Sequence, residues 1–555
     1  MSGEFHSISE PIVTAHYLTQ KIQSISEGPP ARNRLLTTRS NLDKNGLVRK
    51  WTFGQQDVNM QNKIILLVGE SGTGKTTLIN VMVNHLLGVK FTDKVWFEIT
   101  EEGESNDMPD QSNSQTTQIT MYEVFAQENP ICLTLIDTPG FGDTKGTHMD
   151  KQIGENLYKL LNTDSGVKEI DAVCLVVKAS DNRLSDRQHY IFDAVFSLFG
   201  KDIENSIVIF VTHSDGLPPT NVINAIKKEG IQCRKEQNEP VYFLFNNRQT
   251  EKRNETFKRG HQTAWEQTED SLKKFFDTLE GENRKSLELT ECVLTESIQL
   301  EACLVNLQFR IEFEENKGKE LAQTQRALAE NQEKIKRNEN FTFTVTKYYK
   351  EKVAINKKAW QKSKATTCSV CQENCHEYGC SLTPNVLWCE VIKQNYCTSC
   401  TNKCHFTKHV RESKKYVTRS KCVTMTYDDL KRQCENDDLA FNLRTVVNIR
   451  EDLQNNKKQA LEHLNIENSL IIQLIRNKKE KAKLIEEACT IIIRLSEIAL
   501  KTDSAFIVKS LDFLIPRAEE TERDFLADKL KALRKIQPES QERVNAAMGY
   551  YNKLH

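Results

Sequence analysis

A nine-residue stretch of the sequence, GESGTGKTT at residues 69–77, has the composition and spacing of a phosphate-binding loop. It follows the apolar run KIILLV, typical of a buried strand, and it opens the helical pattern TTLINVMVNHLL. Glycines at such a turn let successive backbone N–H groups point at phosphate oxygens, and the positive end of the following helix faces the same place. The predicted nucleotide-binding residues of this loop are Gly69, Glu70, Ser71, Gly72, Thr73, Gly74, Lys75, Thr76 and Thr77.

Two motifs have residue types that suit a nucleotide with bound Mg²⁺. Lys75 can reach the β- and γ-phosphates, and the hydroxyl of Thr76 can bind the metal ion. A second motif, DTPG at residues 137–140, follows the apolar run ICLTLI. Asp137 can hold the hydration shell of Mg²⁺, and the backbone N–H of Gly140 can sense whether a γ-phosphate is present.

The segment between these motifs, SNSQTTQITMYEV, has the character of a mobile first switch before an edge strand. Thr116 or Thr117 can complete the coordination of Mg²⁺. A threonine in a solvated loop is the competing interpretation. The residues with a predicted part in catalysis are Lys75, Thr116 and Gly140.

A third motif, THSD at residues 212–215, follows the apolar run SIVIFV and suits recognition of the base. The Asp215 carboxylate can accept hydrogen bonds from the N1–H and the exocyclic amine of guanine, a donor pair that adenine lacks. Thr212 and His213 belong to the same predicted site. Asn246 or Asn247, after the run VYFLF, can also contact the base. An ordinary turn at the end of a strand is the alternative for this motif.

Five segments together resemble the immunity-associated (avirulence-induced) GTPases, of the septin and chloroplast-translocon branch of P-loop GTPases. They are GESGTGKTTLIN, DTPGFGD, RLSDRQHYIFDAVFSLFG, FVTHSD and YFLFNNR, within about residues 61–250. The resemblance implies a domain that binds GTP, and it favours Thr116 over Thr117 because Ser114-Gln115-Thr116 matches the family's Ser-x-Thr switch. It also implies slow hydrolysis and dimerisation across the nucleotide face.

The sequence departs from the usual guanine-binding pattern at two positions. His213 replaces the basic residue that ordinarily packs along the base. Phe141 follows the DTPG motif, so no glutamine stands there to orient an attacking water. In the GTPases that the chain resembles, an apolar residue at this position goes with slow hydrolysis, and the resemblance implies that hydrolysis here depends on a partner or a second protomer.

A second chemical signal lies in the cysteines, because nine of the 16 in the chain fall between Cys368 and Cys422. In a chain without a predicted signal peptide, this crowding favours metal over disulfides. The Cys-x2-Cys pairs that begin at Cys368 and Cys397 can each close on a tetrahedral Zn²⁺. The zinc-ligand candidates are Cys368, Cys371, Cys375, His376, Cys380, Cys389, Cys397, Cys400, Cys404, His405 and His409. Two sites need fewer ligands than this, so the ligand set stays open. A structural site is favoured over a RING, because no further Cys-x2-Cys pair follows Cys404.

The elements that must position these residues predict an α/β fold: a P-loop domain with a mostly parallel sheet, then a long helical region with an inserted zinc-binding module. The run VWFEI is among the predicted strands. The predicted divisions are an N-terminal extension of no assigned role (1–60), a GTP-binding domain (61–255), a long helical or coiled-coil segment (256–360), the Cys/His module (365–422) and a helical C-terminal region (423–555).

A seven-residue line of apolar side chains runs through the long helical segment, at Leu300, Leu307, Leu321, Leu328 and Ile335. Its companion line turns polar, which favours a helix packed in its own domain over a self-associating coiled coil. The basic residues between Lys408 and Lys421 suit nucleic acid or a membrane surface, but a solvated face is the favoured interpretation.

Composition narrows the class further. The net charge is −1, which gives no global attraction to nucleic acid or membrane, and no apolar run reaches 18 residues. We expect a cytoplasmic GTPase switch with Mg²⁺ and Zn²⁺ as cofactors. Its expected partners are GTP and GDP, a second copy through the GTP-binding domain, and proteins through the helical half. The alternatives are an ATP-dependent signalling NTPase and a binding scaffold whose zinc module and helices carry the function.

Overall fold

The computed structural model of this 555-residue chain divides into two compact units, each described by itself below. The first unit comprises residues 1–295, 495–508 and 535–555, and the second comprises residues 296–494 and 509–534. The structure describes residues 21–43, 46–56, 61–101, 118–126, 131–140, 147–163, 165–181, 192, 195–228, 230–280, 284–337, 339–355, 364–377, 385–436, 455–501 and 505–535.

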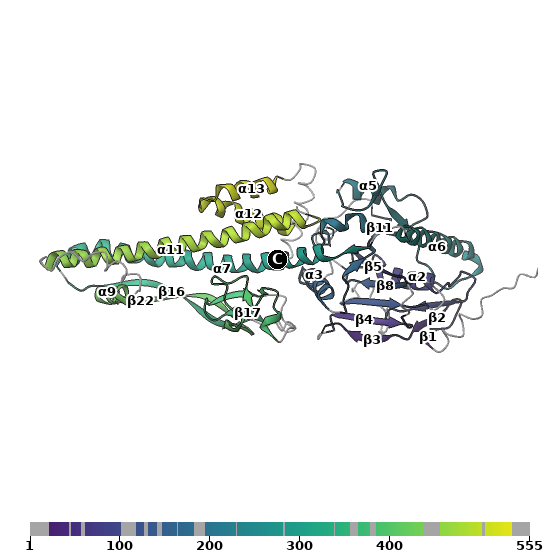
Figure 1. The fold of residues 1–555 in the computed structure, drawn as a ribbon, viewed down its shortest axis with the longest axis horizontal. Coiled ribbons are helices and arrows are strands. Elements are labelled where there is room, and N and C mark those ends of the chain that lie inside the picture. The colour runs from purple at the N-terminus through teal and green to yellow at the C-terminus, as the bar shows by residue number, and fades with distance from the viewer. Residues whose placement is uncertain are drawn as a thin grey trace, which may run out of the picture. The chain divides into compact units, whose positions relative to one another are not determined.

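The first unit is built on an eight-stranded, mostly parallel sheet of strand order β14-β11-β10-β5-β8-β7-β4-β3 (Figure 1). The central strand β5 lies parallel to both β8 and β10, while the pairs β7–β8 and β3–β4 are antiparallel. This confirms the predicted P-loop α/β fold. The strands are β3 (Thr38–Asn41), β4 (Val48–Phe53), β5 (Gln61–Gly69), β7 (Ile119–Val124), β8 (Ile131–Asp137), β10 (Ala172–Lys178), β11 (Ile207–Thr212) and β14 (Tyr242–Leu244).

Helices cover both faces of this sheet, which is why its central strands are apolar throughout. One apolar cluster joins the sheet to α3 (Thr147–Asn162) and α5 (Thr220–Lys228). A second cluster joins the other face to α2 (Lys75–Leu86) and α6 (Lys258–Glu280). The carboxyl ends of the parallel strands are thereby held in one row, which is where the predicted nucleotide-binding motifs lie.

Residues within the unassigned N-terminal extension complete the sheet. Strand β4 pairs in parallel with β7 and β3 continues the edge, so the sheet extends beyond the predicted start at residue 61. A small separate sheet has the order β1-β2-β6. The run VWFEI does form a strand, but it pairs with β2 in this small sheet and not in the main one. The small-sheet strands are β1 (Ile22–Ser26), β2 (Ala31–Leu35) and β6 (Val95–Glu98).

Short elements connect the main strands of the first unit. Strand β9 pairs with β15 and β12 pairs with β13, each in an antiparallel two-stranded ribbon. Their bounds are β9 (Glu169–Ile170), η1 (Lys201–Ser206), β12 (Lys235–Glu236), β13 (Glu239–Pro240), η2 (Glu255–Phe257) and β15 (Lys285–Ser286).

Two long helices, α7 (Glu288–Glu330) and α11 (Asn455–Ile498), run antiparallel in the second unit (Figure 1). Arg494 of α11 forms an ion pair with Glu296 of α7 at 3.3 Å. The other helices with residues in this unit are α8 (Gln332–Lys336), α9 (Tyr427–Asn436), α12 (Ala505–Glu520) and α13 (Asp524–Arg534). No helix in the described part of the chain is long and apolar enough to cross a membrane.

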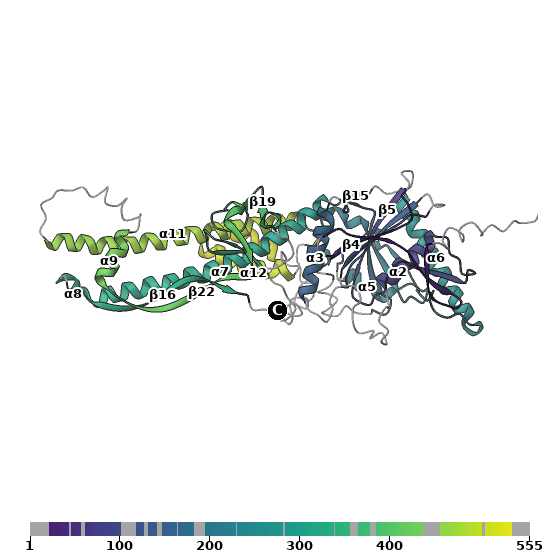
Figure 2. The same ribbon diagram turned by 90° about the horizontal axis from the view of Figure 1, so that it is seen from below.

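A long two-stranded ribbon replaces part of the helix predicted to reach residue 360. Strand β16 (Thr342–Ala354) pairs antiparallel with β22 (Lys414–Thr426) along its 13 residues (Figure 2). Phe343 and Val345 are buried while Thr344 between them is exposed, a period of two that only a strand can use. They pack with Leu328 of α7 and Ile335 of α8, so the end of the predicted apolar line is buried within its own unit.

The cysteine-rich module folds into small antiparallel sheets. Three strands have the order β18-β17-β21, and β19 pairs with β20. The elements are β17 (Ala365–Cys368), β18 (Glu373–His376), η3 (Val386–Trp388), β19 (Ile392–Lys393), β20 (Tyr396–Cys397), η4 (Phe406–Lys408) and β21 (His409–Glu412).

Candidate functional site

The predicted phosphate-binding loop connects β5 to α2 and has the backbone shape that its glycines allow. Gly72 and Gly74 have positive φ angles of 76° and 88°, which side chains with a Cβ rarely adopt. A Cβ on Gly69 would lie 2.4 Å from the carbonyl oxygen of Val176. The first turn of α2 contains no acidic residue, so the positive end of the helix faces the loop without a competing carboxylate.

Lys75 lies inside this loop. Its Nζ donates hydrogen bonds to the carbonyl oxygens of Gly69 at 3.1 Å and Glu70 at 3.0 Å. Burial lowers the pKa of Lys75 to about 8, although the Asp137 and Glu70 carboxylates act in the opposite direction. The ammonium group is therefore held where phosphate oxygens can take the place of carbonyl oxygens.

The two described residues predicted to bind Mg²⁺ meet in the structure. Asp137 ends β8 directly beside Leu67 of β5, and it is buried. The hydroxyl of Thr76 donates to Asp137 Oδ2 at 3.1 Å. A hydroxyl and a carboxylate at this spacing are oxygen ligands of the type that Mg²⁺ prefers, so the residues fit this ion.

The DTPG segment packs against the phosphate-binding loop. A Cβ on Gly140 would lie 2.4 Å from Cα of Ser71, so only glycine permits this approach. The hydroxyl of Thr138 donates to the carbonyl oxygen of Leu67 at 2.8 Å and fixes the start of the segment. Gly140 is thus beside the loop that would surround the phosphates, as its predicted role requires.

The third motif is tied to the same loop. The Thr212 hydroxyl lies 2.8 Å from the carbonyl oxygen of Thr73 and 3.1 Å from that of Val177. The backbone N–H of Ser214 donates to the carbonyl oxygen of Phe245 at 3.1 Å, which places the THSD turn beside the end of β14. Three motifs far apart in the sequence therefore converge at the carboxyl ends of β5, β8 and β11, beside the end of β14.

The residues predicted to contact the base follow the ends of β11 and β14. Asp215 is exposed, and its Oδ1 accepts from the N–H of Leu217 at 3.0 Å. His213 has a φ of 54°, and its pKa is lowered by partial burial and then by the positive charges of Lys178 and Arg248. Asn246 lines a pocket together with aromatic side chains that include Trp265.

Three residues of the predicted nucleotide site lie outside the described residues: Thr116, Thr117 and Phe141. Their predicted roles stay predictions. The other members of the phosphate-binding loop are in place, since Glu70, Ser71 and Thr73 lie in the turn and Thr77 lies in the first turn of α2.

The second candidate site is the cysteine-rich module, where the structure brings metal-ligand side chains together in three groups. Within each group the ligand atoms lie within 4.8 Å of one another. The first group is Cys368, Cys371, Cys400 and Cys404, the second is Cys375, Cys397, Cys400 and His409, and the third is His376, Cys389 and Glu390. Thiolates and imidazoles in fours are the donor set of structural zinc.

Two predicted zinc ligands are not in these groups. His405 faces the hydroxyl of Thr407 at 3.0 Å and packs against the rings of Tyr396 and Phe406, so it belongs to none of the three. Cys380 lies outside the described residues. Glu390 is a ligand candidate that the sequence analysis missed, and its position directly after Cys389 was the available signal.

The basic residues beside this module are partly paired with acids. Lys415 forms an ion pair with Glu377 at 2.8 Å, and Arg419 forms one with Glu351 at 3.1 Å. Both partners of the second pair are about half exposed, so this pair contributes little to stability. These pairs agree with the favoured interpretation of a solvated, charge-balanced face.

Comparison with known proteins defines the class of the first unit. Residues 60–170 match the septin family. Together with the phosphate-binding loop and the mostly parallel sheet, this match supports a P-loop GTPase fold for the first unit, joined in one chain to a largely helical region. No curated protein matches the chain.

Two of the solved structures with partial likeness to this chain are Toc33, a chloroplast translocon component, and a small GTPase. Toc33 from Arabidopsis thaliana in complex with GDP and Mg²⁺ is 16% identical, with 41% of this chain and 89% of that chain covered and a TM-score of 0.28. The Arl6 BBS3 small GTPase from Trypanosoma brucei with bound GppNp is 11% identical, with 40% and 100% covered and a TM-score of 0.23. Likeness at these TM-scores carries no conclusion about this chain.

Proposed function

We propose that the first unit binds GTP and GDP with Mg²⁺ and acts as a nucleotide-dependent switch. The observation that carries this proposal is the meeting of Thr76 and Asp137, 3.1 Å apart, beside the buried ammonium group of Lys75. The septin-type match over residues 60–170 supports the same class. No single motif identifies a nucleotide site, but the convergence of three motifs on one loop supports one.

Each of these residues has a role in the proposed site. Lys75 holds the β- and γ-phosphates, while Thr76 and Asp137 hold the metal ion directly or through its water shell. A bound Mg²⁺ would neutralise phosphate charge. Because Gly140 packs against Ser71, a γ-phosphate at the loop would contact or displace the DTPG segment. Thr116 completes the metal coordination in this proposal, and Asp215 reads guanine.

Hydrolysis is proposed to be slow and to depend on a partner or on a second copy through the GTP-binding domain. The support is the residue type at position 141, a phenylalanine that cannot orient a water. An arginine from the partner would stabilise charge in the transition state. We place the protein in the cytoplasm, and we propose that the helical half binds the proteins that respond to the nucleotide state.

GTP turnover at increasing concentrations of the purified full chain tests this proposal. Turnover per chain should rise with protein concentration, because a second copy completes the site. The Thr76→Ala variant should show no turnover, while Thr407→Ala, at an exposed position of the second unit, should behave as wild type. ATP turnover in place of GTP turnover would overturn the proposal in favour of an ATPase, and no turnover with either nucleotide would favour the scaffold.

A second proposed function, favoured by the three ligand groups, is zinc binding in the second unit. Buried cysteines at metal-ligand spacing supply the thiolates, and the short strands around them form only a small core. Metal binding provides folding free energy that such a module needs. The zinc content of the purified chain, measured after dialysis, tests this proposal directly, and a chain without zinc would contradict it.

A further inference from the structure

Cys400 occupies a shared position in the cysteine-rich module. Its sulfur lies within 4.8 Å of the ligand atoms of both four-residue groups. The two groups contain seven different side chains. Seven ligands can complete two four-coordinate sites only if one of them binds both ions, and Cys400 is the side chain common to both.

The spacing of the sulfurs fits a tetrahedral site. In the first group, Cys371 Sγ and Cys404 Sγ are 3.7 Å apart. Two thiolates bound to one zinc ion at about 2.3 Å are separated by about 3.8 Å across the edge of the tetrahedron. Neither thiol belongs to a disulfide, and the separation, which two hydrogen-bonded thiols also adopt, is the one that two ligands of a single ion need.

The tautomer of His409 prepares its other nitrogen for a metal. Nδ1 lies 3.2 Å from the carbonyl oxygen of His405. A carbonyl oxygen only accepts, so Nδ1 carries a proton, and in the neutral imidazole Nε2 presents a lone pair. Nε2 is buried without a hydrogen-bond partner among the described residues, and the side chain is only 5% exposed. A buried imidazole held in this way beside three thiols is oriented to bind a metal ion.

Backbone N–H groups already surround the sulfurs as they do around thiolates. The N–H of Cys404 donates to Cys400 Sγ at 3.2 Å, and the N–H of Cys400 donates to Cys397 Sγ at 3.3 Å. The N–H of Cys371 donates to Cys368 Sγ at 3.4 Å. Such bonds stabilise negative sulfur and orient the ligands of a metal. Gln372 and Lys403 have positive φ angles of 52° and 45°, which lets the chain curl tightly around each group.

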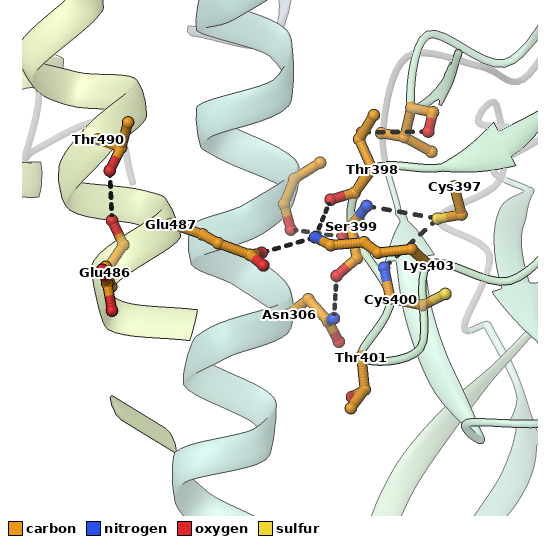
Figure 3. A network of polar contacts seen from close by, with 12 residues as sticks. Asn306, Cys397, Thr398, Ser399, Cys400, Thr401, Lys403, Glu486, Glu487 and Thr490 are labelled. Atoms are coloured by element: carbon orange, nitrogen blue, oxygen red, sulfur yellow. Dashed lines mark hydrogen bonds and ion pairs between the residues drawn. The ribbon is translucent and has the colours of Figure 1, made fainter. Parts of the chain in front are cut away.

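The loop that supplies Cys397, Cys400 and Cys404, residues 397–404, rests on the two long helices of the same unit (Figure 3). Asn306 of α7 donates to the carbonyl oxygen of Ser399 at 2.9 Å and to Glu373 Oε2 at 2.9 Å. Lys403 forms an ion pair with Glu487 of α11 at 2.6 Å. One loop of the cysteine cluster thereby contacts both helices.

Glu373 is the buried centre of this contact. Its carboxylate lies 3.6 Å from Arg310 Nε of α7, and both side chains are less than one-tenth exposed. It also accepts from the N–H of Thr401 at 3.0 Å. Because Glu373 lies between ligands Cys371 and Cys375, the shape of the cluster decides whether this carboxylate reaches its partners. A buried carboxylate without its partners is strongly destabilising.

We propose that two zinc ions bind in this module and share the thiolate of Cys400, and that this two-metal centre holds residues 397–404 in the shape that docks on α7 and α11. The inference rests on the zinc binding proposed above and adds its stoichiometry, its bridge and its structural role. Six thiolates around two divalent ions leave a net negative charge. Two lysines place positive charge beside the cluster. The Nζ of Lys350 donates to the carbonyl oxygen of Cys371 at 3.1 Å, and Lys403 belongs to the loop that supplies the ligands.

Zinc content of the purified full chain and of four single variants tests the sharing. Cys371→Ser removes a ligand of the first group only, Cys397→Ser removes one of the second only, and Cys400→Ser removes one from both. Cys422→Ser is the matched control, since Cys422 is exposed on β22 and belongs to no group. Relative to wild type, the first two variants should lose one zinc each, Cys400→Ser should lose two, and the control should lose none.

Loss of only one zinc from Cys400→Ser would overturn the sharing. If all three ligand variants lose both ions, the cobalt-substituted wild-type chain decides. Two Co²⁺ ions bridged by one thiolate couple magnetically, so the electron paramagnetic resonance intensity per bound cobalt should fall below that of isolated ions. Full intensity would overturn the bridge. Absence of any zinc from the wild type would contradict zinc binding itself, and unchanged nucleotide binding in every variant separates these outcomes from the GTPase proposal.

The docking role has its own readout, hydrogen exchange of the full chain. Removal of zinc by a chelator should increase exchange in α7 around Asn306 and in α11 around Glu487, since the loop no longer packs there. The Cys422→Ser control should keep its protection before chelation. Unchanged exchange in both helices after complete zinc removal would overturn the docking role.

Discussion

Lys75 is the buried cation of the proposed phosphate site, and its lowered pKa predicts a nucleotide affinity that depends on pH. The free protein loses this proton as the pH rises through about 8, whereas phosphate oxygens keep the ammonium group charged in the complex. Affinity for GDP should therefore be constant well below the pKa and fall about fourfold between about pH 7 and 8.5. Equilibrium titration with a fluorescent GDP analogue at constant ionic strength measures this.

The Lys75→Met variant provides the control for this pH effect. It should bind GDP weakly, and its affinity should not follow the same profile, because the titrating group is gone. A wild-type affinity that stays flat to pH 8.5, or a variant that retains the fall, would show that another group titrates.

Thr76 tests the metal site at the scale of one hydroxyl. Thr76→Ala removes the group that donates to Asp137, and the loss of a polar interaction with a charged partner is worth about 1.5–3 kcal/mol. Affinity for GTP with Mg²⁺ should fall roughly 10- to 100-fold, while Thr76→Ser, which keeps the hydroxyl, should stay close to wild type. Titrations with Mg²⁺ and with excess EDTA separate the metal effect, and equal losses in both conditions would contradict it.

The packing of the DTPG segment on the phosphate-binding loop gives a prediction for a whole element. Gly140→Ala would place a Cβ 2.4 Å from Cα of Ser71, so the segment or the loop must shift. The preference for GTP over GDP should decrease, since the segment no longer reaches the γ-phosphate. Gly260→Ala on α6 is the matched control, because nothing lies within 4 Å of its Cβ position. Paired titrations with GDP and a non-hydrolysable GTP analogue measure the ratio, and an unchanged ratio in Gly140→Ala would contradict a sensing role.

Some strands of the fold could be predicted from the sequence alone, whereas β4 and β16 could not. Strands β5, β10 and β11 are apolar along their length, so their place in a covered parallel sheet was predictable. Strand β4 reads VRKWTF, half-buried and charged, and only its pairing with β7 reveals it as part of the sheet. Strand β16 contains KYYKEKV, which resembles an exposed helix until its 13-residue partner β22 is known.

The candidate sites divide in the same way. The phosphate loop is local in sequence, so its residues were predictable from spacing alone. The zinc-ligand candidates of one group come from different segments of the chain, such as Cys371 and Cys404, which are 33 residues apart. Spacing alone does not say which Cys-x2-Cys pair shares an ion with which other residues. The exclusion of His405 and the inclusion of Glu390 depend on side-chain direction, which needed the fold.

At the scale of the whole molecule, the two proposed ligands belong to different units. A ligand that binds only the folded form stabilises it by RT ln(1 + [L]/Kd), about 2.7 kcal/mol at a hundredfold excess over Kd. GDP with Mg²⁺ should raise the melting temperature of the transition that reports the first unit, and zinc removal should lower that of the second. Calorimetry of the full chain measures both, with Cys400→Ser as the variant that lacks the zinc response. If GDP changes the melting temperature of neither transition, the assignment of the nucleotide site is contradicted.

Selectivity for guanine is the central claim for the whole protein, and it depends on Asp215. The most direct measurement is a titration of the purified chain with labelled GTP and ATP in Mg²⁺, for wild type, Asp215→Asn and the control Asp270→Asn, an exposed carboxylate on α6. We predict that GTP binds tightly, that ATP does not compete, and that only Asp215→Asn weakens GTP, because the amide loses the paired acceptor for guanine. Equal binding of both nucleotides, with Asp215→Asn unaffected, would contradict the account and reduce Asp215 to a turn residue.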